Sequence, residues 1–569
     1  MNMMMPQSMG GTGRRRRCVP GIIFAGLVIS GFVVGCGSGQ APQFETEADS
    51  TPAADSIGER LFLDTRFAEY FAAHMTGVND PLATGDPVVS TVENGANPLP
   101  GAFAGQSINC RSCHFVTEFQ GVAHAGNRTY ADFTTRSPIP RVISGFDHTP
   151  RNAMQMVGSL QTGAQLLHFD GEFATPEALV EATMTGRNFG WDLTQEGQAL
   201  AHIARVIRED NGADQLATDR TNGLSYGVLF LGTDSRITSD LKLPASQRLD
   251  VSKATDQQIL DEVALCISTY MHDLRFKQDE FGRYIGSPYD NFLRVNHLPV
   301  QPLAGETKAQ YNQRLYNEVT ALKNPIYITA KDGSFQYHAQ TYQFGATELA
   351  GLIVFLKIGT AGGGDDQHAG NCAACHQAPD FTDFSFHTTG VSQDEYDAVW
   401  GAGAFMNLHV PSLTERNANF NQYMPASGAH PDAIEAFRHA ASATNPALAD
   451  LGMWNIYQNA DVPGPQKILS SIVCAQGRDC AVDAGLANTI AQFKTPTLRD
   501  LEDSAPYFHN GSRATFEEVV AFYVSSSQLA HQGALRNAPT EFANMHLTQD
   551  DIAALAAFLK SLTEDYDDA

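Results

Sequence analysis

Two copies of the pattern Cys-x-x-Cys-His constrain what this chain can fold into and bind more than any other sequence feature. The first copy consists of Cys110, Cys113 and His114, and the second of Cys372, Cys375 and His376. Two thiols at this spacing can each form a thioether with a haem vinyl group, and the adjacent His then faces the iron. One copy alone is also compatible with a zinc site or a redox-active Cys pair. Two copies in one chain predict two covalently bound haem c groups, with His114 and His376 as proximal iron ligands.

The first forty residues predict export from the cytoplasm. Arg14–Arg17 precede an apolar stretch from Val19 to Val34, which is the pattern of a signal segment. The tetrad ending at Cys36 resembles a bacterial lipobox, whose Cys is lipidated. We interpret residues 1–36 as a signal or lipoprotein segment and residues 37–54 as a linker. The folded part is then periplasmic or on the cell-envelope side, anchored through Cys36, with a plain secretory signal and an uncleaved anchor as the alternatives.

Composition and the remaining cysteines agree with a folded, exported protein. The chain is 43% hydrophobic and long enough for two or more domains. Its formal net charge of −26 excludes a nucleic-acid-binding surface and favours a basic or neutral partner. Cys474 and Cys480 flank a short polar loop, so an oxidising compartment predicts a local disulfide between them, with two free thiols as the alternative.

A repeated block follows each haem motif. Residues 169–183 align without a gap with residues 509–523, and each block reads as a turn followed by an apolar helical pattern. Thr175 and Thr515 are predicted helix N-caps. Pro176 supports the first helix start, and Glu518 is predicted to complete a capping box in the second. The repeat predicts two related helical domains.

The repeat also suggests domain boundaries. We predict an N-terminal cytochrome c domain over residues 55–208 and a C-terminal one over residues 343–569. Residues 209–342 have no counterpart in the other half and contain helical patterns, so we interpret them as a helical insertion. Residues 417–458 are interpreted as a smaller insertion in the C-terminal half.

Three segments after the second haem motif carry a recognisable pattern: Phe381–Gly390, Phe493–Arg499 and Pro506–Gly511. They resemble the bacterial di-haem cytochrome c peroxidase family, which includes the MauG-type enzymes. The resemblance implies a mainly α fold in which two cytochrome c-type haem domains pack together. One haem then transfers electrons and the other meets hydrogen peroxide.

The resemblance also implies which haem is which. In the family, the sixth ligand of the C-terminal haem lies on the helix after an Asn-Gly or Asp-Gly turn, and that position is Tyr523 here. A Tyr at this place is similar to the MauG-type branch, where it lowers the haem potential; the alternative is that Tyr523 only packs beside the haem. The gapless repeat aligns Tyr523 with Thr183, a poor iron ligand. The N-terminal haem is therefore expected to be open and reactive, unless Met184 fills the site.

Two family features are missing from this sequence. The inter-haem tryptophan of the family is Phe169 here, with Trp191 and Tyr226 as the conceivable substitutes. The glutamine and glutamate that the peroxidases place over the reactive haem correspond to Leu179 and Phe189. Nearby polar side chains are the candidates for the acid–base role, although such residues are more often solvated. These candidates are Glu177, Glu181, Arg187 and Asn188.

Loop histidines and an ion site complete the expectations that the resemblance implies. His124, His148 and His168 are candidate sixth ligands in a resting state. Ser504 and Pro506, with Asn152 as a third, match positions that bind an inter-haem calcium ion in the family.

Three functions follow from this sequence. The leading prediction is an exported di-haem peroxidase that takes electrons from a small cytochrome c or cupredoxin. A MauG-like oxidase of a partner protein or organic substrate is the first alternative, and a non-enzymatic di-haem electron carrier is the second. Family members often form homodimers. Membrane contact is expected only through the N-terminal lipid or anchor.

Overall fold

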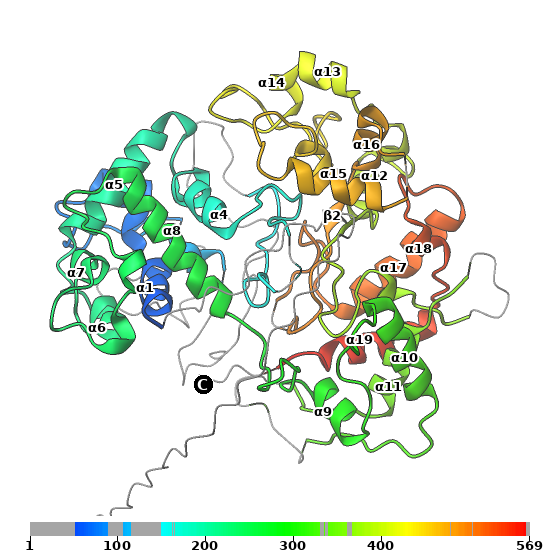
Figure 1. Ribbon diagram of the computed structural model, residues 1–569. Coiled ribbons are helices and arrows are strands. Elements are labelled where there is room, and N and C mark those ends of the chain that lie inside the picture. Colours follow the sequence, from blue (N-terminus) through cyan, green and yellow to red (C-terminus); the bar gives the residue numbers. More distant parts are fainter. Residues whose placement is uncertain are drawn as a thin grey trace, which may run out of the picture. The chain divides into compact units, whose positions relative to one another are not determined.

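The structure is a computed structural model that describes residues 52–88, 106–114, 149–161, 163, 165–330, 335, 340–360, 367–477, 479–502 and 504–564. The predicted signal segment, nearly all of the predicted linker, His124 and His148 lie outside the described residues. Helices dominate the described part, which confirms the mainly α prediction (Figure 1). Its two-stranded antiparallel sheet pairs β1 (Phe386–His387) with β2 (Phe493–Lys494). None of the described helices combines the length and the apolar character needed to cross a membrane.

The N-terminal core is built around α8 (Asp256–Asp273), which packs against α1 (Pro52–Leu63), α4 (Pro176–Met184) and α5 (Glu196–Glu209) (Figure 1). A capping box between Thr255 and Gln258 starts α8, and its apolar side chains recur at helical spacing. The crossing with α1 occurs at Gly58, where a Cβ atom would lie 2.0 Å from the carbonyl oxygen of Cys266. The two backbones can approach this closely because Gly58 has no side chain.

The C-terminal core repeats this arrangement. There α19 (Ile552–Lys560) packs against α11 (Ala346–Leu356) and α17 (Phe516–His531). The crossing of α11 and α19 occurs at Gly351, where a Cβ atom would lie 2.0 Å from the carbonyl oxygen of Ala554. The pair α1–α8 in the first half therefore corresponds to the pair α11–α19 in the second half.

Shorter elements complete the described fold. The other α-helices are α2 (Glu69–His74), α6 (Gln215–Thr221), α7 (Tyr226–Leu231), α9 (Pro288–Val295), α10 (Lys308–Thr320), α12 (Val391–Trp400), α13 (Leu413–Ala418), α14 (Phe420–Tyr423), α15 (Gln466–Ala475), α16 (Val482–Asn488) and α18 (Thr540–Ala543). The 3-10 helices are η1 (Thr65–Phe67), η2 (Cys110–Ser112), η3 (Arg187–Phe189), η4 (Leu193–Gln195), η5 (Ser239–Leu241), η6 (Ala245–Gln247), η7 (Cys372–Ala374), η8 (Phe405–Asn407), η9 (Met453–Asn455) and η10 (Gln549–Asp551).

The segment predicted as an insertion, residues 209–342, is divided between the two main cores in the part of the chain that the structure describes. Val263 and Ile267 of α8 are buried in the N-terminal core. Tyr311 and Leu315 of α10 are buried in the C-terminal core. The N-terminal core therefore extends well past residue 208, because α8 covers the apolar face that α1 presents.

A third core joins the two halves. It contains Leu166 from the N-terminal half together with Phe437, Trp454 and Phe493 from the C-terminal half. The segment predicted as a smaller insertion, residues 417–458, supplies part of this core and therefore packs with residues from both halves. Beside it, a disulfide links Cys474 to Cys480, which confirms the prediction for this pair.

Candidate functional site

The two repeat blocks adopt the same backbone. An antiparallel bridge closes each turn, Leu167 with Phe173 in the first block and Tyr507 with Arg513 in the second. Each turn has a residue with positive φ before its Gly, His168 at 63° and Phe508 at 70°. The internal repeat is therefore structural, and it brings α4 and α17 to equivalent places beside the two haem motifs.

The helix caps in the two blocks are nearly as predicted. The side chain of Thr175 accepts a hydrogen bond from the backbone N–H of Ala178, and Thr515 accepts one from Glu518. The Glu518 carboxylate accepts from the N–H of Ala514 instead of the N–H of Thr515. The predicted capping box is thus displaced by one residue, because the Glu518 side chain reaches the donor that precedes the cap.

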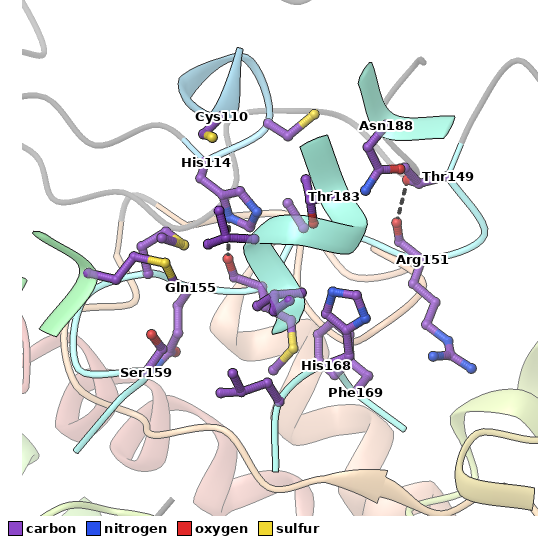
Figure 2. A pocket seen from close by; sticks show the side chains of 18 of the residues that line it. Cys110, His114, Thr149, Arg151, Gln155, Ser159, His168, Phe169, Thr183 and Asn188 are labelled. Atoms are coloured by element: carbon purple, nitrogen blue, oxygen red, sulfur yellow. Dashed lines mark hydrogen bonds between the residues drawn. The ribbon is translucent and has the colours of Figure 1, made fainter. Parts of the chain in front are cut away.

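The first haem motif opens onto a cavity (Figure 2). Cys110 lies on η2 and Cys113 follows it, and both thiols lie in the cavity wall with His114. The Nδ1–H of His114 donates to the carbonyl oxygen of Met154 at 2.8 Å, which leaves Nε2 for a metal. Burial lowers the pKa of His114 to about 4, so the ring is neutral at neutral pH and suited to bind iron.

Apolar side chains form much of the remaining wall. Leu179 and Val180 of α4 and Ile267 and Met271 of α8 line the cavity. Thr183 also lies in the wall, as the repeat predicts (Figure 2). Met184, the competing candidate for the iron, lines the same cavity.

Only part of the predicted acid–base set reaches this cavity. Arg187 and Asn188 lie in its wall, and Arg187 forms an ion pair with Glu435 at 3.3 Å. Glu177 is absent from the wall residues and accepts a hydrogen bond from Ser268 at 2.6 Å, on the side of α4 that faces α8. Glu181 is also absent from the wall residues. The helical period turns these two carboxylates away from the positions of Leu179 and Thr183.

The C-terminal half supplies two cations to the wall of the first cavity, Arg438 and Lys494. Arg438 pairs with Asp170 at 3.0 Å and with Glu172. The sequence alone does not predict either residue at this cavity, because nothing in a linear pattern connects Arg438, in a segment interpreted as an insertion, with a haem motif more than half the chain away.

Arg151 extends this charged group across the two halves. Its guanidinium pairs with Asp170 at 2.5 Å and with Asp450 at 2.6 Å, and all three side chains are buried. Burial alone would raise the pKa of Asp450, but the charge of Arg151 more than offsets this and brings the pKa to about 2. The Asp450 carboxylate is therefore ionised over the physiological pH range.

His168 forms the polar edge of the first cavity (Figure 2). Its Nδ1 lies 3.0 Å from a carboxylate oxygen of Glu172. Burial favours the neutral form of Glu172, but Arg438 and His168 outweigh it, so that the pKa of Glu172 lies well below its usual value. A carboxylate at this distance holds a proton on Nδ1 and leaves Nε2 as a hydrogen-bond acceptor.

The second haem motif opens onto a similar cavity. Cys372, on η7, and Cys375 lie in its wall with His376, whose Nδ1–H donates to the carbonyl oxygen of Phe381 at 3.0 Å. Burial lowers the pKa of His376. Tyr523 of α17 lines this cavity, as the repeat predicts, and burial raises the pKa of its phenol.

A shared wall separates the two cavities. It consists of the segment Asn152–Gln155 together with Phe169 and Lys494, which line both cavities. Phe169 therefore occupies the predicted inter-haem position. Trp191 and Tyr226 line neither cavity; their side chains donate to the Phe67 carbonyl and to Asp64, respectively. The two conceivable substitutes for the family tryptophan thus lie elsewhere.

The residues present fit a covalent haem c in each cavity. Each cavity combines two thiols, a neutral His whose Nδ1 is bound to a backbone carbonyl, and predominantly apolar walls, which is the donor set that a c-type haem requires. Near the shared wall, the Asn152 amide donates to the Pro506 carbonyl at 2.6 Å, and its buried Oδ1 has no hydrogen-bond partner among the described residues.

Comparison with known proteins identifies relatives over part of the chain. No protein-family model matches. A cytochrome-c peroxidase of Denitromonas iodatirespirans is 27% identical over 199 residues, which are 34% of this chain and 36% of that protein. A cytochrome-c peroxidase of a Pseudomonas species is 26% identical over 195 residues, with 34% and 36% covered. A different peroxidase of D. iodatirespirans is 35% identical over 74 residues, 13% of this chain and 18% of the protein. The matches thus span about a third of these relatives or less.

Two solved structures align with more than nine-tenths of this chain at low similarity. One is a MauG-like protein associated with microbial copper homeostasis, at 16% identity and a TM-score of 0.42, with 92% of each chain covered. The other is the diheme peroxidase BthA from Burkholderia thailandensis, at 15% identity and a TM-score of 0.39, with 91% of this chain and 89% of that one covered.

Proposed function

We propose that this chain, which belongs to the bacterial di-haem cytochrome c peroxidase family with its MauG-type members, is an exported oxidoreductase that reduces hydrogen peroxide. The observation that carries the proposal is the asymmetry of the two cavities. Thr183, a poor iron ligand, lines the first cavity, whereas Tyr523, at the equivalent position of the repeat, lines the second. An N-terminal iron without a sixth protein ligand would be free to meet peroxide. A C-terminal iron bound by Tyr523 would instead suit electron transfer.

When bound, the two haem c groups supply irons that exchange single electrons. His114 and His376 would hold them through Nε2, while the Met154 and Phe381 carbonyls keep the proton on each Nδ1 and fix the ring orientation. Leu179, Val180 and Ile267 would exclude bulk water from the first cavity.

Reduction of peroxide to water also consumes protons, and His168 is the residue that we assign to this task. Glu172 holds the proton on Nδ1 of His168, so Nε2 can accept a proton and release it to a departing oxygen. Arg438 keeps Glu172 ionised while His168 gains and loses its proton. This arrangement would replace the glutamine and glutamate that are missing from α4 and η3.

A steady-state assay tests the proposed activity. The purified, fully haem-loaded protein, with and without pre-reduction, is given hydrogen peroxide and either a reduced small cytochrome c or a reduced cupredoxin. We expect peroxide-dependent oxidation of a donor, faster with basic than with acidic donors because the chain carries a net charge of −26. A loaded protein that oxidises no donor under any of these conditions would rule the proposal out.

Electron paramagnetic resonance then tests the assignment of the two sites. In the oxidised protein we expect one high-spin signal from the N-terminal haem and one low-spin signal from the C-terminal haem. Tyr523→Phe should change the low-spin signal alone, and Met184→Leu should change neither. Two low-spin signals that ignore Tyr523→Phe and peroxide would instead indicate an electron carrier.

A second candidate function rests on Tyr523. A phenolate ligand would lower the potential of the C-terminal haem, which favours oxidation of a partner protein or organic substrate in the manner of a MauG-type enzyme. Peroxide-induced absorbance changes that persist with small donors and decay only when a partner is added would favour this candidate over a peroxidase.

Three accompanying features are part of the proposal. A calcium ion would bind between the haems at the oxygens of Asn152, Ser504 and Pro506, for which the unpartnered Oδ1 of Asn152 is the support. Metal analysis of the purified protein would detect it. Lipid attachment at Cys36 and a homodimer are checked by mass spectrometry of the membrane-extracted protein and by its mass in solution.

A further inference from the structure

Lys494 is a buried lysine in the wall that the two cavities share. The strand pair places it there, because β2 lies antiparallel to β1 with Lys494 opposite Phe386. The side chain is 7% exposed and reaches into the N-terminal half, where its Nζ donates to the carbonyl oxygen of Leu166 at 2.6 Å. One residue thus borders both haem cavities and bonds to a segment 328 positions away.

The ammonium of Lys494 has no carboxylate partner among the described residues. The three arginines in the wall of the first cavity already have carboxylate partners: Arg151 pairs with Asp170 and Asp450, Arg187 with Glu435, and Arg438 with Asp170 and Glu172. Burial lowers the pKa of Lys494 to about 8, and no charged neighbour opposes this shift. An ammonium has three donors, and the Leu166 carbonyl uses one of them.

A buried charge without a partner is costly, so the Lys494 ammonium suits a site that binds an anionic group. A haem c that is attached through its vinyl groups keeps two free propionate carboxylates, and each cavity must accommodate a pair of them. Of the other residues in the shared wall, Ala153, Met154 and Phe169 have apolar side chains, and Asn152 and Gln155 carry neutral amides. Lys494 is therefore the one cation among the shared-wall residues.

We propose that Lys494 pairs with haem propionates at the shared wall and that its positive charge raises the reduction potential of both haems. This inference rests on the proposed binding of two haems. A nearby cation stabilises the reduced form of each iron, which carries one positive charge less. Because Lys494 borders both cavities, its removal should act on both haems in the same direction.

Spectroelectrochemical titration of the haem-loaded full-length protein tests the inference. In Lys494→Met we expect the ratio of reduced to oxidised haem, at a fixed applied potential, to fall about tenfold for each haem, which is a shift of about 59 mV for a one-electron couple. Lys494→Arg keeps the charge and should stay within about twofold of the wild type. Lys467→Met, which removes an exposed lysine on α15, is the matched control and should shift neither haem.

Resonance Raman spectroscopy supplies a second readout. The propionate bending modes should shift in Lys494→Met and not in Lys494→Arg. If the Met variant does not load haem, Lys494→Gln takes its place, because its amide can still donate to the Leu166 carbonyl without carrying a charge.

The outcomes separate the two proposals. A wild-type protein with fewer than two covalent haems would overturn the proposed function and this inference with it. A fully loaded protein whose two potentials and propionate modes do not respond to loss of the Lys494 charge would overturn the inference alone. A shift at one haem only would also contradict it, since the shared wall requires an effect on both.

Discussion

In the proposed proton transfer, His168, Glu172 and Arg438 each have a separate role. Arg438 keeps Glu172 ionised, Glu172 orients the imidazole, and the imidazole faces the first cavity. Each of these roles depends on the previous one, because a protonated Glu172 would no longer hold the proton on Nδ1. His168 has a positive φ of 63°. This backbone conformation is unfavourable for a non-glycine residue, so the surrounding packing must stabilise it.

Replacing His168 by Leu should lower the rate of peroxide reduction about a hundredfold, because a general acid–base group contributes at least this much. The spectra of both haems should change little if His168 acts in proton transfer, whereas a changed spectrum of the N-terminal haem would indicate the sixth-ligand role that the family resemblance implies for His168. Stopped-flow measurement of the reaction with peroxide gives the rate.

Glu181→Gln is the matched control for this substitution. Its carboxyl is absent from the cavity wall, so the rate should stay within about twofold of the wild type. If the rate fell strongly in Glu181→Gln and was unchanged in His168→Leu, the acid–base group would lie on α4, as the sequence pattern predicts.

At the scale of elements, the two helix crossings determine where the haem motifs lie. α1 and α8 in one half, and α11 and α19 in the other, touch backbone to backbone at Gly58 and Gly351. η2 and η7, which carry the Cys-x-x-Cys-His motifs, pack against α1 and α11 respectively. A change in either crossing is therefore transmitted to the neighbouring cavity.

Gly351→Ala should destabilise the protein by about 2 kcal/mol, because the new Cβ would lie 2.0 Å from the Ala554 carbonyl oxygen and the helices must separate. Gly197→Ala on α5 is the control, since a Cβ there meets nothing within 4 Å and the helix gains about 0.5 kcal/mol. Thermal unfolding of the loaded proteins measures both. An unchanged midpoint in Gly351→Ala would contradict the close crossing.

The helix types and starts were largely predictable, and the assignment of helices to domains was not. Caps such as Thr175 and Thr515 are local signals that the sequence displays directly. By contrast, α8 has the apolar pattern of any buried helix, and nothing in that pattern says that its partner is α1. This is why residues 209–342 were interpreted as an insertion.

At the scale of the whole molecule, an ion pair and a hydrogen bond between distant segments join the two halves. Arg151 reaches Asp450 across 299 residues of sequence, and Lys494 reaches Leu166 across 328. The first cavity is therefore completed by the C-terminal half, and the third core packs around the same region. The proposed reactive site therefore belongs to the assembled chain and not to one domain.

Arg151→Met should destabilise the protein at pH 7 by about 3 kcal/mol, because it leaves Asp170 and Asp450 buried without this partner. The pKa of Asp450 is about 2 in the folded protein and about 3.9 in an unfolded chain. Its contribution is thus fully present above pH ~4 and is lost as the pH falls toward 2.

Urea unfolding of the wild type and Arg151→Met from pH 7 to pH 2 measures this difference in stability, which should shrink below pH ~4. Arg205→Met is the control, because Arg205 and Glu209 form an exposed pair that contributes about 0.3 kcal/mol. A difference that stays constant down to pH 2 would show that Arg151 acts through packing and not through its ion pairs.

The sequence by itself determined the features that depend on near neighbours. Residue spacing alone predicts the two Cys-x-x-Cys-His motifs, the repeated turn and helix, the short-range disulfide, and the positions of Thr183 and Tyr523. Only the tertiary structure decided which distant groups meet those motifs. Arg438 and Lys494 reach the haem cavities because the third core packs residues of the C-terminal half against residues of the N-terminal half, and a linear pattern does not record contacts between such distant segments.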